Sequence, residues 1–493
     1  MNRLFGYFAV ALVMILMFAV ASCERPTEPP HANNPPDTKL ANIPKDNDTV
    51  FALVTLFWDG GDYDGYITRY QYRYFTYHLL PGTGQWILFD STGWRDTTGS
   101  TVTIPFNSTD SLNKQEFYVR AIDNDGNIDP TPAQKLLTTT RTAPPVTKLI
   151  APVKNANVLV SQHITDWWPG LNLVFNAKDQ AKEGAIVEYA WSVDGGAWTW
   201  VTDTSLYLPP AVFKEPLNGP HTVKVTSRNN TNLVDPVGDS ALVTLIVPTF
   251  EKSVLIIDET DEFNSPFVTM RVSDATVDSF YARVFPGAES WDFKAKGMPP
   301  RDVLSHYKLL VWHADDVPVS RPHKISDPAN IAIFTDYLKV GGKFLMSGWR
   351  ILKSFAYYNN FPYAFPPGSF VYDYLHIYTA DETDVVGDCT GGKGKPGITS
   401  DFAVDSVKLA ISPYNGKLGW VNLIIKPAGF TDVLYAYVNR DDSPNPTYRG
   451  RGMALRYYGT VYDAVVLGFP MYFVVEADAI VMAEQILRNL HVN

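Results

Sequence analysis

The stretch SVLIIDET, from Ser253 to Thr260, marks a change in the pattern of the chain. Its continuous apolar run stops at two acids, which is typical of a parallel strand buried on both faces. Strand and helix patterns then alternate, which predicts an α/β domain with a parallel sheet over residues 249–493. The predicted strands are ESWDFKA (289–295), KLLVWHADD (308–316) and KFLMSGW (343–349), and the predicted helices are TVDSFYARVF (276–285), PPRDVLSHY (299–307) and DPANIAIFTDYLKVGG (327–342).

The same pattern closes the chain. AVVLGFPMYFVVEADAIVMAEQIL, Ala464 to Leu487, predicts a last strand and an amphipathic helix. An insertion at about residues 351–458 precedes this pair, and its segments VDSVKLAI, GWVNLIIK and DVLYAYV have strand character. The run FAYYNNFPYAFPPGSFVYDYLHIY (355–378) is rich in Phe and Tyr. We expect it to cover the carboxyl edge of the sheet, with a binding groove as the alternative, because a large insertion must bury apolar surface to fold.

The region before the α/β domain has the pattern of two β-sandwiches, predicted at residues 39–142 and 143–248. Short alternating runs are broken by Gly and Asp turns, as in VFALVTLFWDGGDYDGYITRYQYRYFTY, and LNLVFNAKDQAKEGAIVEYAWSVDGGAWTWVT repeats that plan. Trp58 precedes the turn Asp62-Tyr63-Asp64-Gly65, and a later strand ends in a turn with Ala121, Asp123, Gly126 and Asp129. These motifs resemble bacterial fibronectin type III-like domains. The resemblance implies two all-β sandwiches of the fibronectin or immunoglobulin kind, which form a diverged repeat.

The N-terminus predicts export. MNRLFGYFAVALVMILMFAVASC has one positive charge and an apolar run, and it ends in small residues before Cys23, so residues 1–22 are interpreted as a signal peptide. Val20-Ala21-Ser22-Cys23 resembles a bacterial lipobox, which implies lipidation of Cys23 and anchoring to a membrane of the cell envelope, at the outer membrane or the cell surface. An uncleaved membrane anchor is the alternative. Residues 23–38, rich in Pro, are expected to form an extended tether.

Charge and cysteine content limit the classes of ligand and the covalent links that the chain can have. The chain has 493 residues, a net charge of -11 and two cysteines. The acidic balance excludes a basic surface for nucleic acid. If Cys23 carries lipid, Cys389 remains alone and no internal disulfide is possible.

The order of elements after residue 252, the segment GGKFLMSG and the closing strand–helix pair resemble class I glutamine amidotransferase-like domains, which implies a flavodoxin-like α/β fold. Members that are enzymes carry a nucleophilic cysteine on the turn after the strand that here is KFLMSG, and a histidine and a glutamate in the last loop. This turn has Ser347, Gly348 and Trp349, while Phe469, Pro470 and Met471 stand where the histidine would fall. Glu476 could match the glutamate, although it lies further along than the family pattern places it, and Cys389 lies inside the insertion. The mechanism needs nucleophile and base together, so we predict a domain that is not catalytic.

Polar residues at the strand ends form the main candidate site. His313, Asp315 and Asp316 follow one strand, and Asp258 and Glu259 follow another. Ligands of doubly wound sheets bind at this edge, and imidazole with carboxylates suits a divalent metal or a hydrolase. The plain alternative is that these acids cap helices and face water.

Two further sets of residues are candidates for binding. Asp123, Asp125, Asn127 and Asp129 alternate and would offer oxygens to Ca²⁺, although turn formation explains them as well. Trp167 and Trp168, in the loop DWWPG, are expected to be exposed and to stack on sugars. Trp349, at the turn after KFLMSG, is a further binding candidate.

The function predicted from the sequence is therefore a lipoprotein of the bacterial cell envelope with a binding or scaffolding role towards a glycan, a peptide or a protein. No cofactor is expected, apart from the Ca²⁺ alternative. One alternative is a hydrolase acting on carbohydrate or peptide through His313, Asp315 and Asp316, which would have to converge in an open pocket. The other is a structural spacer, in which the insertion seals the edge of the sheet.

Overall fold

The computed structural model of the protein describes most of the chain from residue 32 onward. The predicted signal peptide, Cys23 and the first part of the tether lie outside the described residues. Contacts divide the chain into two compact units, one of Met1–Thr147, Ala177–Tyr189 and Thr226–Val237 and one of Lys148–Asn176, Ala190–Val225 and Gly238–Asn493. The described residues are 32–41, 49–50, 52–80, 82–106, 113–139, 143–180, 184–260, 273–316, 321–385, 388–410, 415–427, 429–440 and 446–492.

The first β-rich region is a sandwich of two sheets. Trp58 and Leu56 of one sheet pack against Phe117 and Val119 of the other, because alternate residues of each strand face the same core. One sheet has the order β1 (Asp37–Ala41), β3 (Leu53–Gly61), β7 (Thr101–Pro105), and the other has the order β2 (Thr49–Val50), β9 (Ala133–Thr139), β8 (Asn113–Asp123), β4 (Ile67–Leu79), β5 (Trp86–Ser91), with β6 (Arg95–Thr97) also paired with β4.

The second β-rich region also has two sheets. One has the order β10 (Val146–Ala151), β12 (Leu171–Lys178), β15 (Ser205–Leu208), and the other has the order β11 (Asn157–Leu159), β17 (Asp239–Ile246), β16 (Gly219–Asn229), β13 (Ile186–Val193), β14 (Thr199–Val201).

One turn occurs in both sandwiches, at the end of β8 and at the end of β16. Asp123 Oδ1 accepts hydrogen bonds from the backbone N–H groups of Asp125 and Asn127. Asn229 Oδ1 accepts hydrogen bonds from those of Thr231 and Leu233 in the same relative positions. The sequence repeat therefore extends to the hydrogen bonds of this turn.

A parallel sheet organises the last part of the chain. Its strands lie in the order β19 (Glu289–Asp292), β18 (Lys252–Asp258), β20 (Tyr307–Ala314), β21 (Lys343–Gly348), β29 (Asp463–Leu467), and each pairs in parallel with its neighbour. Counted along the chain, this order is second, first, third, fourth, fifth, which is one of the orders of doubly wound sheets. The direction of winding changes between β18 and β20, so the carboxyl ends of these strands mark the place where such sheets bind ligands.

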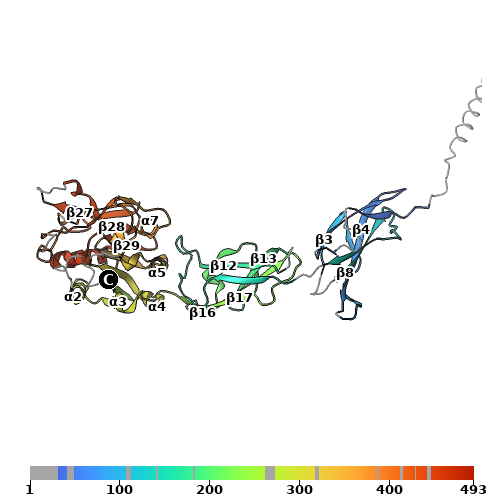
Figure 1. Ribbon diagram of the computed structural model, residues 1–493, viewed down its shortest axis with the longest axis horizontal. Helices are drawn as coiled ribbons and strands as arrows, with labels where there is room; N and C mark the ends of the chain where they lie inside the picture. The colour runs from blue at the N-terminus through green and yellow to red at the C-terminus, as the bar shows by residue number, and fades with distance from the viewer. Residues whose placement is uncertain are drawn as a thin grey trace, which may run out of the picture. The chain divides into compact units, whose positions relative to one another are not determined.

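Helices cover both faces of this parallel sheet. Val254 and Ile256 of β18 pack in one core with α2 (Asp274–Val284) and α8 (Glu476–Asn489). Leu255 and Ile257 pack in the other with α4 (Arg301–Leu304) and α5 (Pro328–Lys339). The unbroken apolar run of β18 follows from this burial on both faces. Figure 1 shows α2 to α5 in the same compact part of the ribbon as β27, β28 and β29.

The insertion continues this sheet with antiparallel strands. β28 (Gly452–Tyr458) pairs with β29, and the order continues through β26 (Asn422–Pro427), β23 (Ile377–Glu382) and β22 (Tyr363–Ala364). β27 (Thr431–Asn439) pairs with β28 and with β24 (Cys389–Gly394), which pairs in turn with β25 (Phe402–Ala403). The sheet is therefore mixed, whereas the sequence predicted parallel strands and a separate β-rich insertion.

Two local predictions were wrong, both because an aspartate forms a turn. In ESWDFKA the strand ends at Asp292, whose side chain accepts from Ala295 N–H and begins the short helix α3 (Phe293–Lys296). In VDSVKLAI the carboxylate of Asp405 accepts from Val407 and Lys408 N–H, and a turn replaces the expected strand. Among the described residues, none of the helices has the length and apolar character needed to cross a membrane.

Candidate functional site

His313, at the end of β20, is the centre of a buried polar cluster. Its Nδ1 lies 2.9 Å from Asp315 Oδ2 and 3.4 Å from Asp258 Oδ1. The hydroxyl of Thr260 is 3.2 Å from the same nitrogen. The imidazole stacks on the ring of Tyr281 from α2, with the centroids 3.7 Å apart and 12° between the planes. The predicted meeting of His313, Asp315 and Asp258 therefore occurs, but all three are buried rather than set in an open pocket.

The charge on His313 reflects a balance of two opposing effects. Burial lowers the pKa of the imidazole, but the nearby carboxylates of Asp258 and Asp315 outweigh burial and raise it overall. Nε2 is buried and has no hydrogen-bond partner among the described residues. The polar contacts of His313 among the described residues are therefore all made through Nδ1.

Asp274 and Asp278, in the first half of α2, join Asp258 from the other side. One ligand oxygen from each of the three carboxylates lies within 4.8 Å of the others, which makes them the one such group among the described residues that could hold a metal ion. Burial and repulsion by Asp258 raise the pKa of Asp274 to about 7 and that of Asp278 to about 6. The sequence gave no motif for this group, because Asp274 and Asp278 are remote from Asp258 along the chain.

The carboxylate of Glu259 bonds away from the His313 cluster, contrary to the prediction of one ring of acids. The carboxylate of Glu259 accepts hydrogen bonds from the backbone N–H groups of Lys324 and Ile325 and, at 3.1 Å, from the indole N–H of Trp312. Burial raises its pKa to about 7, and the charge of Asp316 adds to the effect. The acid therefore serves as a buried anchor for the backbone that leads into α5.

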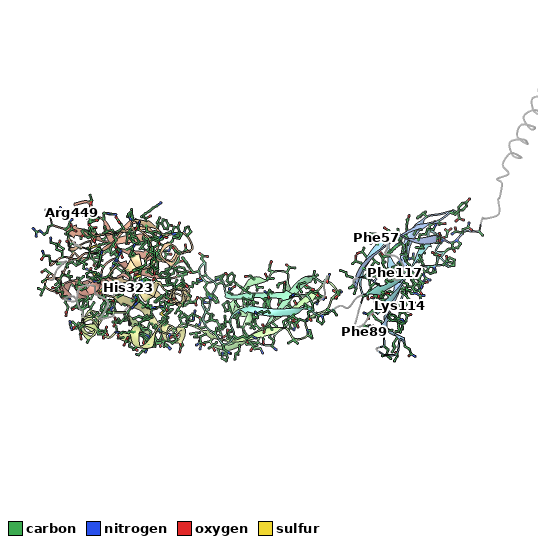
Figure 2. All side chains as sticks on the ribbon, viewed as in Figure 1. Phe57, Phe89, Lys114, Phe117, His323 and Arg449 are labelled. Carbon is green, nitrogen blue, oxygen red and sulfur yellow. The ribbon has the colours of Figure 1, made fainter. Side chains whose placement is uncertain are left out.

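His323 lies beside this anchor, inside the α/β part of the chain (Figure 2). Burial lowers its pKa to about 4, so the ring is neutral at pH 7. Its Nε2 donates a hydrogen bond of 2.7 Å to the carbonyl of Trp349. The sequence gave no sign of this residue, whose contact joins segments far apart in the chain.

The turn after β21 is where the sequence has no cysteine to act as a nucleophile. A Cβ on Gly348 would approach the carbonyl oxygen of Ala314 to 2.6 Å, so this close approach requires glycine. The residue in the left-handed conformation is Arg350, with φ 51° and ψ 32°, and α6 (Ile351–Ser354) follows it. Arginine at this turn cannot act as a nucleophile, because its guanidinium is a donor only and stays protonated.

The insertion occupies the space above that turn. The Arg350 guanidinium makes a two-pronged ion pair with Glu382 of β23, at 2.9 Å for each hydrogen bond. It also lies over the ring of Trp420, 4.9 Å from the centroid. Asn422 of β26 accepts from Leu352 N–H. The residues of the insertion that contact this turn are thus charged and polar ones outside the Phe- and Tyr-rich run 355–378, which was expected to cover the edge.

Ser347 and Glu476, the remaining stand-ins for catalytic groups, have structural partners. The Ser347 hydroxyl donates to the carbonyl of Phe469 and accepts from Met471 N–H, at 3.0 and 2.9 Å, which fixes the last loop to β21. Glu476 pairs with Arg283 of α2 at 2.7 Å. Cys389 is the first residue of β24 rather than a loop residue, and burial raises its thiol pKa to about 12. None of them meets the nearby base that covalent catalysis needs.

The predicted aromatic surface is not exposed. Trp349 has 0% and Trp168 6% of its surface accessible. Trp167 is half-buried and packs on Tyr374 and Tyr462, with centroid distances of 5.4 and 5.0 Å. The expected exposure was therefore wrong for Trp168, and Trp349 is fully buried too, whereas Trp167 and the edge of Trp168 line a cavity, so sugar binding there stays a prediction.

The predicted calcium ligands form the turn at the end of β8. Asp123 and Asp129 are buried, while Asp125 is exposed. Both oxygens of Asp123 accept N–H groups, from Asp125 and Asn127 and from the side chains of Asn33 and Asn127. Asp129 accepts from Thr131. The three aspartates are not the group with converging ligand oxygens, so the geometry favours turn formation over a Ca²⁺ site.

The unusual pKa of Glu259 predicts a pH-dependent stability. The folded chain holds this proton up to about pH 7, whereas the unfolded chain releases it near 4.5, so stability falls as the pH rises from the lower value and levels off only about one unit above the folded pKa. Between pH 6.5 and 8 this residue alone should remove about 0.8 kcal/mol from the free energy of unfolding. Glu259→Gln should flatten the curve measured by urea denaturation, and the exposed control Glu289→Gln should not. An unchanged slope in Glu259→Gln would contradict the assignment.

Comparison with known proteins shows solved structures that are similar to parts of the chain. No protein-family model and no curated protein matches it. Among solved structures, the fibronectin(III)-like modules of Clostridium thermocellum CbhA share 14% identity over 43% of this chain and 95% of that one, with a TM-score of 0.20. A Dscam structure shares 13% over 44% of this chain and 47% of that one, about half its length, with a TM-score of 0.16. The PKD1 domain of Vibrio anguillarum Epp shares 18% over 22% of this chain and 100% of that one, with a TM-score of 0.14. At such TM-scores the sandwich architecture rests on the strand pairing described above.

Proposed function

We propose that this chain is a lipid-anchored protein of the bacterial cell envelope with a binding or scaffolding role, and that its amidotransferase-like α/β domain does not catalyse a reaction. The observation that supports this proposal is the turn after β21. The residues on this turn are Ser347, Gly348 and Trp349, with no cysteine among them, and the next residue, Arg350, is bound by Glu382 of the insertion. His313 is buried, and its Nδ1 faces the carboxylates of Asp315 and Asp258 and the hydroxyl of Thr260. The Ser347 hydroxyl is bonded to the last loop instead.

The catalytic part of the proposal is tested on the soluble chain from Glu24 onward. We expect no release of ammonia from glutamine, and no cleavage of ester, peptide or glycoside substrates above the rate without protein. Turnover that is retained in Cys389→Ser but lost in His313→Ala would instead establish the hydrolase alternative. A thermal unfolding curve for each variant separates lost activity from lost folding.

The anchoring part of the proposal is tested on the full-length chain in a bacterial host. We expect the wild type to incorporate labelled fatty acid and to fractionate with membranes. Cys23→Ala should lose the label, and Cys389→Ser is the matched control because it removes the other cysteine. Equal labelling of Cys23→Ala and the wild type would contradict lipidation at Cys23.

A further inference from the structure

The outward face of the six-stranded sheet in the first sandwich carries an unusual row of side chains. The alternation of β4 and β8 sends Tyr70 and Phe117 into the core and the neighbouring residues to the outer face. Register places Gln71 opposite Arg120 and Arg73 opposite Tyr118. Trp94 lies in the link between β5 and β6 and reaches the same row. We call this outer surface the binding face. Its residues are Gln71, Arg73, Phe75, Trp94, Tyr118 and Arg120.

Arg73 and Arg120 share an aromatic ring instead of an acid. The guanidinium carbons lie 4.6 and 4.0 Å from the centroid of Trp94. Arg73 also lies over the ring of Tyr118 at 5.2 Å, and its Nε is shielded from solvent with no acceptor among the described residues. Arg120 donates from Nε and Nη2 to the amide oxygen of Gln71. Within the described part of the chain neither arginine has an ion pair.

Other cations on the same face are already neutralised. Arg69 lies 3.5 Å from Asp96, and Lys114 lies 3.1 Å from Glu116. The contrast matters because the chain as a whole is acidic, with a net charge of -11. Asp129 acts electrostatically on Arg120, and Asp96 and Glu116 accept hydrogen bonds from Gln71 and Tyr118 of the same face. Arg73 and Arg120 nevertheless form a pair of adjacent cations without an ion pair of their own among the described residues, which is the local charge that an anion needs.

We propose that the binding face of the first sandwich takes a short glycan that carries carboxylates, such as a uronic acid oligosaccharide; this inference rests on the proposed binding function. The forked guanidinium of Arg73 matches a carboxylate, and Arg120 supplies a second charge. The half-buried rings of Phe75 and Tyr118 offer apolar surface to a pyranose ring.

An acidic peptide fits this face less well than a sugar. Extended peptides bind sheets chiefly by adding a strand to a free edge. β4 pairs with β8 on one side and with β5 and β6 on the other, and β8 pairs with β4 and β9. The backbone groups of both strands are therefore used, and the face offers side chains only.

The test is calorimetric titration of the soluble chain with an oligogalacturonate, and with its methyl ester as the neutral counterpart. We expect binding of the acid form only. Arg73→Gln should weaken it by about tenfold, equivalent to about 1.4 kcal/mol, and Arg120→Gln by several-fold. Arg69→Gln, on the same strand and face but paired with Asp96, should change it less than twofold. Arg73→Lys keeps the positive charge but loses the forked guanidinium, so its affinity for the oligogalacturonate should lie between those of the wild type and Arg73→Gln.

Several outcomes would overturn the inference. Equal binding of the methyl ester would show that the carboxylate is not recognised, and unchanged affinity in folded Arg73→Gln and Arg120→Gln would place the site elsewhere. Equal binding of an oligoglutamate would assign the face to acidic peptides. If the wild type binds none of these probes, the inference fails while the proposed lack of catalysis stands. If it binds and cleaves the oligogalacturonate, the proposed function fails while the site stands.

Discussion

Replacing Glu382 with alanine is expected to lower the free energy of unfolding by about 3 kcal/mol. The substitution leaves the guanidinium of Arg350 without its carboxylate in a site where the two side chains are only 19% and 11% exposed. A charge that is partly removed from water costs several kcal/mol when its partner is lost, because neither solvent nor protein then neutralises it. Urea denaturation of the soluble chain, followed by tryptophan fluorescence, measures the change.

A surface ion pair of the same insertion is the matched control. Lys393 and Asp401 lie 2.6 Å apart, but their side chains are 68% and 57% exposed. Lys393→Ala should therefore cost less than about 1 kcal/mol. If Glu382→Ala costs no more free energy of unfolding than Lys393→Ala, the Arg350–Glu382 ion pair does not hold the insertion on the turn after β21.

Trp349→Ala should cost about 4 kcal/mol, the largest effect expected for a single substitution near the turn. The indole is fully buried, it packs edge-on against Phe473 with centroids 5.2 Å apart, and truncation leaves a cavity in the core. The measurement is again the urea denaturation curve.

Tyr358→Ala is the control for aromatic truncation, because that ring is 90% exposed. It should change stability by less than about 0.5 kcal/mol. A small effect of Trp349→Ala, together with gain or loss of ligand binding, would restore Trp349 to the binding role that the sequence suggested.

The sequence predicted the regular elements well where burial sets the pattern. The strand at SVLIIDET, the helix after Asp327 and the closing strand–helix pair appear as β18, α5, β29 and α8. Asp327 caps its helix and Pro328 begins it, as the local residues indicate. The patterns failed where Asp292 and Asp405 capture backbone N–H groups, because a single side-chain acceptor there overrides strand propensity.

The candidate site was predicted only in part. The meeting of His313 with Asp258 and Asp315 follows from neighbouring parallel strands, whose carboxyl ends share one edge. The burial of these three side chains could not be predicted from the sequence. It depends on α2, which brings Tyr281 onto the imidazole of His313, and no local pattern predicts that contact. The left-handed Arg350 and its partner Glu382 were also missed, since the pairing depends on how the insertion folds back.

The place of β29 in the sheet has a consequence for the order of folding. This strand belongs to the last part of the chain, yet it lies between β21 and β28 and joins the parallel strands to those of the insertion. A ribosome releases residues in sequence. The edges of β21 and β28 that pair with β29 therefore stay unpaired until Leu467 has been synthesised. Such late, long-range closure slows folding and exposes edges to aggregation, and a nascent chain stalled before Asp463 should be a substrate for chaperones or proteases.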